Sequence, residues 1–194
     1  MHQILLIRHG EAAKSPINDD PGLTTTGRHQ AEQLASALQQ RFPAGKGVRL
    51  ISSPKARARQ TAVPVALKWQ KVVAEEPKAI EIPSPEGLAL ADRGRWIRSL
   101  LQRQWSDLEP AQVRWREIFI DFLQELEQSA GEHHTSLVFC HFMVINSVVA
   151  AIRGNDQVTQ FRPDYTSQTR ITLKDGQLEL TELGRDLGIG NLIQ

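Results

Sequence analysis

An arginine, a histidine and a glycine follow directly on a short apolar run near the start of the sequence. The run, Ile4–Ile7, includes two β-branched residues and predicts a strand buried on both faces. Arg8 offers a fork of donors that suits phosphate or carboxylate oxygens, and His9 can act as a base, a metal ligand or a nucleophile. Gly10 allows a ligand to approach the backbone closely. Because open α/β sheets bind ligands beyond the carboxyl ends of their strands, these residues predict a site at this strand end.

Two further apolar segments end in residues that could serve the same site. Leu50–Ser52 predicts a strand, and Ser53 suits the N-cap of a following helix. Arg57 would then lie in the first helical turn, where free N–H groups favour an anion. Ser136–Cys140 predicts another strand, with His141 directly after it. In a parallel sheet these strand ends share one edge, so the sequence predicts a single anion site.

These motifs recur together, in the same order, in a known family. They are Arg8-His9-Gly10-Glu11, the segment Asp20-Pro21-Gly22-Leu23-Thr24 with Gly27, Gln30 and Ala31, the stretch Ser52 to Ala62, and the strand that ends at His141. Together they resemble the histidine phosphatase (phosphoglycerate mutase-like) superfamily, over residues 4 to about 154. Thr24 and Gly27 also have a structural interpretation, as a helix cap and a close-packing glycine, which we favour.

The resemblance implies a role for each matching residue. His9 would be the nucleophile that accepts a phosphoryl group, and Arg8, Arg57 and His141 would surround the phosphate oxygens, with His141 also taking part in catalysis. Phosphoryl transfer is largely positioning and charge stabilisation, which two arginines and a second histidine can provide. No metal and no cofactor are expected.

The family takes its catalytic acid from a glutamate soon after a strand. Glu81, followed by Ile82, matches best, and Glu86, before Gly87, is the alternative. The glycine and the aromatic residue usual between the two glutamates are absent here. Three further glutamates are the next candidates: Glu11, Glu75 and Glu76.

Other charged and aromatic residues are interpreted as lying outside the site. Arg59, two positions after Arg57, falls on a different helical face and is expected to be solvated or ion-paired. A locally basic stretch is interpreted as a solvated face; its arginines are Arg93, Arg95, Arg98 and Arg103. A tryptophan cluster is interpreted as core rather than substrate wall; its members are Trp96, Trp105 and Trp115.

Apolar periodicity predicts the elements that would position the site. Helices are expected near residues 25–42, 54–70, 92–105, 110–129 and 144–153. Further strands are expected at 48–52, 72–74 and 79–82, and a hairpin at 170–183 around Asp175-Gly176. With 194 residues, we expect a single domain over 1–194, a three-layer α/β/α fold around a mixed, mainly parallel sheet of about six strands.

Composition excludes several function classes. The 23 basic and 22 acidic residues give a net charge of +1, which offers no electrostatic case for nucleic acid. The lone cysteine excludes an intrachain disulfide and suits a reducing cytosol. No run approaches the roughly 18 apolar residues that span a membrane. We expect a cytoplasmic protein without membrane contact, and the sequence does not predict its oligomeric state.

We therefore expect a metal-independent phosphomonoesterase that works through a phosphohistidine on His9. Its substrate would be a small phosphorylated metabolite, a nucleotide or a phosphoprotein. One alternative is phosphoglycerate mutase-type transfer, although such mutases generally carry longer insertions. The other is a phospho-ligand binding or regulatory module without turnover, against which the retained Arg8, His9, Arg57 and His141 argue.

Overall fold

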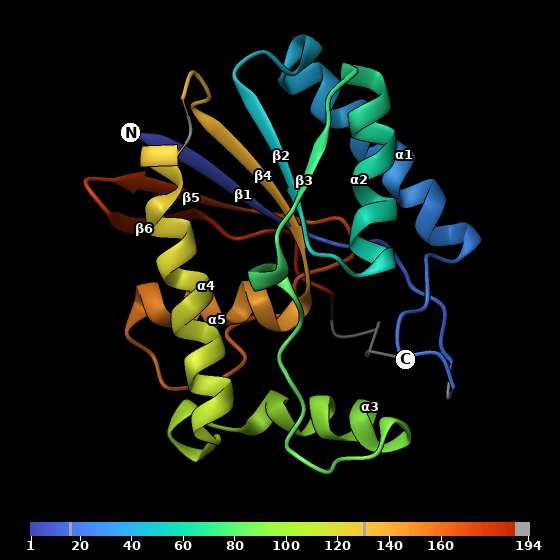
Figure 1. Cartoon of the computed structure of the whole chain (residues 1–194), viewed down its shortest axis with the longest axis vertical. Coiled ribbons are helices and arrows are strands. Elements are labelled where there is room, and N and C mark those ends of the chain that lie inside the picture. The colour runs from blue at the N-terminus through green and yellow to red at the C-terminus, as the bar shows by residue number, and fades with distance from the viewer. Residues whose placement is uncertain (16, 130, 189–194) are drawn as a thin grey trace.

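The computed structural model describes residues 1–15, 17–129 and 131–188. Within these residues the chain forms one six-stranded sheet in the order β3-β2-β4-β1-β5-β6 (Figure 1). The first four strands in that order run parallel, and β5 and β6 are antiparallel to their neighbours. The strands are β1 (His2–Arg8), β2 (Val48–Ser52), β3 (Val73–Glu75), β4 (Thr135–Cys140), β5 (Gln168–Lys174) and β6 (Gln177–Glu182). The predicted mixed, mainly parallel sheet is confirmed.

Helices cover both faces of this sheet (Figure 1). One face carries α1 (Thr25–Arg41) and α2 (Ala56–Trp69), and the other carries α4 (Pro110–Ser129) and α5 (Phe142–Arg153). α3 (Leu90–Ser99) lies away from the sheet, at the foot of Figure 1. Short 3-10 turns join these elements: η1 (Pro43–Gly45), η2 (Pro77–Ala79), η3 (Leu100–Gln102) and η4 (Trp105–Asp107).

The core is divided into two by the sheet. Successive side chains of a strand point to opposite faces, so Ile4 and Leu6 of β1 pack toward α4 and α5, whereas Leu5 and Ile7 pack toward α1 and α2. Trp105 and Trp115 are buried in the first of these clusters, and Trp96 packs against it. The interpretation as core is confirmed for Trp105 and Trp115, whereas Trp96 is only partly buried.

Three local expectations are wrong. The helix expected near 92–105 ends at Ser99, and the 3-10 turns η3 and η4 follow it. Residues 79–82 form no strand, because η2 begins at Pro77 and Pro83 follows, and a proline has no N–H to give to a sheet. α2 begins at Ala56 with Lys55 as its N-cap, so Ser53 is not the cap. The hydroxyl of Ser53 is instead turned to the site described below.

Candidate functional site

The register of three adjacent strands brings the predicted residues to one edge of the sheet. Arg8, at the end of β1, lies opposite Cys140 at the end of β4. His9 then donates its backbone N–H to the Cys140 carbonyl at 3.0 Å, and Ser53 donates to the Phe139 carbonyl at 2.9 Å. As a result, the ring centroids of His9 and His141 are 5.3 Å apart.

The imidazole of His9 is oriented by its own backbone. Nδ1 lies 2.7 Å from the Gly10 carbonyl oxygen, which can only accept a hydrogen bond, so Nδ1 carries the proton. Nε2 is therefore unprotonated, and its lone pair accepts a hydrogen bond from Arg57 Nε at 3.3 Å. Burial and the charges of Arg57 and Arg8 hold the pKa of His9 well below its usual value. The lowered pKa favours the neutral imidazole, with Nε2 unprotonated on the side of Arg57.

Arg8 is a buried cation whose N–H donors are not all hydrogen-bonded. Its guanidinium donates to the Pro163 carbonyl at 2.8 Å and stacks on the Tyr165 ring at 4.1 Å. Its Nε is buried without a hydrogen-bond partner. Burial lowers the pKa of Arg8, but a guanidinium ordinarily titrates so far above neutrality that the charge remains. A buried charge with an unpaired donor favours an anion at this point.

His141 shows the same incomplete pairing. Its Nε2 lies 2.8 Å from the Ser53 hydroxyl, whereas its Nδ1 is buried and has no partner. Burial, followed by the charge of Arg57 and the neighbouring His9, holds the pKa of His141 well below its usual value. A bound dianion would instead raise the pKa of His141, and one of its oxygens could accept a hydrogen bond from Nδ1.

Glu81 lies at the same site, and Glu86 does not. The Glu81 side chain is buried; its oxygens accept the N–H of Ile82 at 3.0 Å and of Met143, in the first turn of α5, at 3.3 Å. Burial raises the pKa of this carboxyl, against the opposing effect of these bonds and of the Arg57 charge. Glu86 is exposed on a turn.

Arg93 belongs to this site, although its sequence context indicates a solvated face. The Arg93 guanidinium donates to the Ile82 carbonyl at 2.7 Å and to the Ser84 hydroxyl. Its charge acts on Glu81 and on Arg57. Arg93 lies in the first turn of α3, but the segment from Ile82 to α3 is irregular, so the sequence does not predict where this turn lies relative to the sheet.

Two further residues hold the site together without a clear sequence signal. Thr61 accepts the Gly10 N–H at 3.0 Å and donates to the Arg57 carbonyl at 2.7 Å, so it ties the end of β1 to α2. Tyr165 stacks on Arg8, and its ring centroid lies 6.3 Å from that of His9.

Arg59, as expected, is exposed and lies 3.8 Å from a Glu75 carboxylate oxygen.

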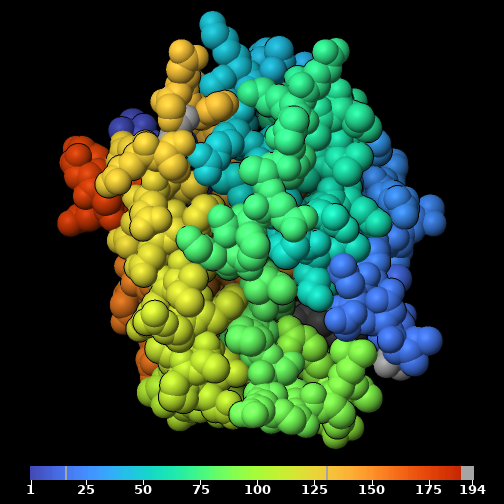
Figure 2. Space-filling model, in the orientation of Figure 1, coloured from blue at the N-terminus to red at the C-terminus, as the bar shows by residue number. Residues whose placement is uncertain are grey.

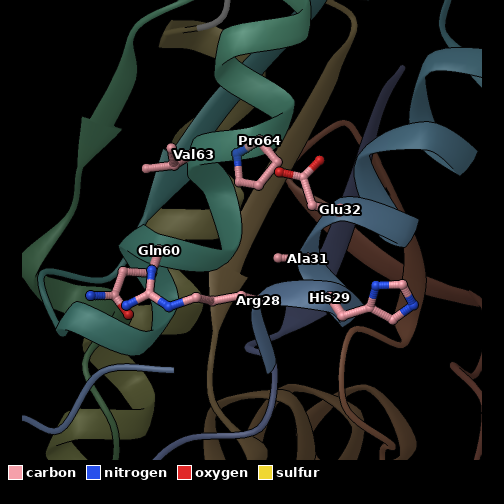
Figure 3. A pocket seen from close by; sticks show the side chains of 7 residues that line it. All are labelled: Arg28, His29, Ala31, Glu32, Gln60, Val63 and Pro64. Atoms are coloured by element: carbon pink, nitrogen blue, oxygen red, sulfur yellow. The ribbon is translucent and has the colours of Figure 1, made fainter. Parts of the chain in front are cut away.

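Figure 2 shows the surface hollowed between the loop of residues 12–22, in blue, and the green segment near residues 80–95. A separate cavity of about 520 Å³ lies between α1 and α2 (Figure 3). Arg28 of α1 reaches across it toward Gln60 of α2, and none of the site residues above lines it.

The described residues contain no group of three or more His, Cys, Asp or Glu side chains arranged to hold a metal ion. In the same part of the chain, no helix combines the length and the apolar character that crossing a membrane requires.

The comparisons with known proteins concern the family and the fold of the chain. A profile of the Histidine phosphatase superfamily (branch 1) matches residues 4–186. Phosphoserine phosphatase from Entamoeba histolytica, solved with 3-phosphoglyceric acid, has a similar structure: TM-score 0.71 and 21% identity over 95% of this chain and 98% of that one. Mycobacterial glucosyl-3-phosphoglycerate phosphatase is similar at TM-score 0.71 and 20% identity, over 96% of this chain and 100% of that one. No curated protein sequence matches significantly. Since the profile spans nearly the whole length, the chain belongs to branch 1 of the histidine phosphatase superfamily.

Proposed function

We propose that this chain is a phosphomonoesterase that works without a metal, through a phosphohistidine on His9. The observation that carries the proposal is the hydrogen bond from His9 Nδ1 to the Gly10 carbonyl, since it leaves the Nε2 lone pair as the nucleophile. The solved neighbours named above are phosphatases, which supports hydrolysis over other phosphoryl transfers.

The first half of the reaction forms a bond from Nε2 of His9 to phosphorus and breaks the ester P–O bond. Arg8, Arg57 and His141 face the phosphoryl oxygens and stabilise their charge. Arg57 Nε, which rests on His9 Nε2 in the free protein, moves its hydrogen bond to the incoming phosphate. The leaving oxygen takes the proton of the Glu81 carboxyl, whose raised pKa favours the protonated form.

In the second half, water attacks phosphorus and the P–N bond breaks. Glu81, now a carboxylate, takes the proton from the water, so both protein groups return to their starting states. Inorganic phosphate leaves. The substrates that fit are small phosphorylated metabolites, nucleotides or phosphoproteins.

The test is covalent trapping on the intact chain with His9→Ala as comparison. Rapid acid-free quenching during turnover of a labelled phosphomonoester should give a labelled protein that is stable in base and labile in acid, as a phosphoramidate is. We expect His9→Ala to lack the label and to lose roughly 10³-fold or more in turnover.

Near-normal turnover in His9→Ala would contradict the covalent mechanism. Assay of phosphate release alongside isomerisation of 3-phosphoglycerate separates hydrolysis from mutase-type transfer. If isomerisation dominates, the phosphohistidine stands and the hydrolase assignment is wrong.

A further inference from the structure

We propose that the cavity between α1 and α2 binds a free amino acid with a small apolar side chain, in its zwitterionic form. The cavity measures about 520 Å³, and small-molecule sites usually measure about 300–1,000 Å³. None of its lining residues takes part in the proposed catalysis, so a ligand here would bind independently of the proposed function. Hydrogen-bond donors lie at one end of this cavity and acceptors at the other (Figure 3).

The donor end is formed by Arg28 and the side-chain amide of Gln60. Arg28 extends from α1 toward Gln60 (Figure 3), and within the described residues it forms no ion pair. Gln60 Oε1 accepts the Leu23 N–H at 2.7 Å. This bond fixes the orientation of the amide and leaves Nε2, which can only donate, for a ligand. Two donors, one of them charged, favour a carboxylate at this end.

The acceptor end is formed by Glu32 and a backbone carbonyl of α2. Figure 3 shows the Glu32 carboxylate beside the Pro64 ring. Pro64 lies inside α2 and has no N–H, so the Gln60 carbonyl, four residues earlier, lacks the donor that a helix normally gives it. A carboxylate beside such a carbonyl favours an ammonium group.

The two charges of the cavity are available separately. Arg28 and Glu32 are one helical turn apart, a spacing at which opposite charges often pair, yet among the described residues Glu32 forms no ion pair either. A ligand that carries one charge of each sign therefore matches the cavity without leaving a net charge. His29 also borders the cavity, but its ring nitrogen bonds to the Gln33 amide at 3.1 Å and its ring points away in Figure 3.

The wall between the two ends is apolar. Ala31 is buried, and Val63 and Pro64 complete this part of the lining. Val63 is 47% exposed, so a ligand can still cover apolar surface here. A carboxylate, an ammonium group and a small apolar side chain occur together in an amino acid such as valine.

Three probes distinguish the two charged ends of the ligand. L-Valine carries both charges, N-acetylvaline lacks the ammonium group, and valinamide lacks the carboxylate. Calorimetric titration into the intact protein should show valine binding about 10-fold or more tighter than either analogue, as expected for hydrogen bonds to charged groups.

Substitutions at the two ends should have different effects. Arg28→Gln should weaken valine by about 10-fold or more and remove its advantage over valinamide, whereas Glu32→Gln should remove its advantage over N-acetylvaline. Pro64→Ala gives the Gln60 carbonyl a helical donor and should weaken valine by about 3- to 10-fold. Arg41→Gln is the matched control, because it removes the same charge from the last turn of α1, outside the cavity, and should leave all three affinities unchanged.

The absence of saturable valine binding below about 10 mM would overturn the proposal. Equal affinities for the three probes would also overturn it, as would valine binding that Arg28→Gln and Glu32→Gln both leave unchanged. Turnover is measured separately. A protein that binds valine as described and hydrolyses no phosphomonoester contradicts only the phosphatase, and an active phosphatase that does not bind valine contradicts only the amino-acid site.

Discussion

Single residues in this site are distinguished by what remains unpaired on each of them. Arg8 Nε and His141 Nδ1 are buried without partners, and both lie beside His9. Buried polar atoms are usually hydrogen-bonded, so unpaired ones close to His9 indicate the place of a ligand. Arg57 differs, because it already donates a hydrogen bond to His9, which under the proposed mechanism it would exchange for one to phosphate.

We predict that Arg57→Ala weakens inhibition by phosphate or vanadate by about 10-fold or more, because it removes a charged hydrogen-bond donor from the anion pocket. Arg59→Ala removes the same charge from an exposed position near Glu75 and should change the inhibition constant little. Inhibition constants and the ligand-induced shift in Tm measure both effects. Equal losses in the two variants would mean that the wrong arginine has been assigned.

The acid is tested by the dependence on the leaving group. We predict that Glu81→Gln lowers turnover of an alkyl phosphate by roughly 10²–10⁴-fold, because an alkoxide leaves poorly without a proton. An aryl phosphate, whose leaving group needs little help, should lose much less. Steady-state rates with both substrates give the comparison.

Glu86→Gln is the control for this prediction, since Glu86 is exposed outside the site. It should leave both rates near those of the wild type. If Glu86→Gln selectively loses alkyl phosphate turnover and Glu81→Gln does not, Glu86 is the acid and the assignment of Glu81 is wrong.

The sequence predicts that residues directly after a strand lie at the site. It does not predict this for residues whose position depends on segments outside the helices and strands. His9 and His141 follow apolar runs, so their shared edge could be expected from topology alone. Arg93 and Tyr165 could not be placed in this way, because residues 83–89, which precede the helix of Arg93, and residues 163–167 belong to no named helix or strand. Glu81 is indicated by family resemblance alone, and the strand expected at residues 79–82 is absent.

Among the elements, α1 depends on an unusually close contact with the chain after β1. Thr24 caps the helix by accepting the Gly27 N–H at 3.0 Å, as expected from sequence, and its hydroxyl donates to the Glu11 carboxylate at 2.6 Å. A Cβ on Gly27 would lie 2.0 Å from the Glu11 carbonyl oxygen. The glycine therefore permits the backbone of α1 to touch the segment that follows His9 and Gly10.

We predict that Gly27→Ala destabilises the protein by about 1–3 kcal/mol, because helix and loop must separate to admit the methyl group. Gly94→Ala on α3 is the opposite case. Its Cβ would meet only the Arg98 side chain, at 3.5 Å, so the better helix propensity should add roughly 0.5–1 kcal/mol. Chemical denaturation of both variants measures the difference. A Gly27→Ala protein as stable as the wild type would show that the contact is not tight.

At the scale of the whole molecule, the site should make stability depend on pH. The pKa values of His9 and His141 are lowered in the folded protein, so below their usual 6.5 the unfolded chain binds protons that the folded chain does not. The two neutral histidines therefore contribute fully to the free energy of unfolding above pH 6.5. As the pH falls below 6.5, this free energy decreases by up to about 1.4 kcal/mol per histidine per pH unit. The raised pKa of Glu81 acts in the opposite direction, because its contribution is lost as pH rises.

We predict that the fall in Tm between pH 7.5 and pH 5.5 is smaller in His141→Gln than in the wild type. The comparison cancels the contribution of Glu81, which both proteins share. Saturating phosphate should also reduce the fall in the wild type, because a dianion raises the pKa of both histidines. His29→Gln, at an exposed position on α1, serves as the control and should follow the wild type. An identical pH dependence in all three proteins would contradict the prediction.

The pairing of β1 with strands much later in the chain has a consequence for biosynthesis. Gln3 pairs with Thr135, and Arg8 receives its last backbone partners from Thr166 and Ser167. At roughly 5–20 residues per second, on the order of ten seconds separate the emergence of β1 from that of β4. Throughout that interval the apolar run Ile4–Ile7 has no strand beside it. The nascent chain therefore carries His9 long before the rest of the site exists, and the run Ile4–Ile7 stays exposed to aggregation for longer the more slowly the chain elongates.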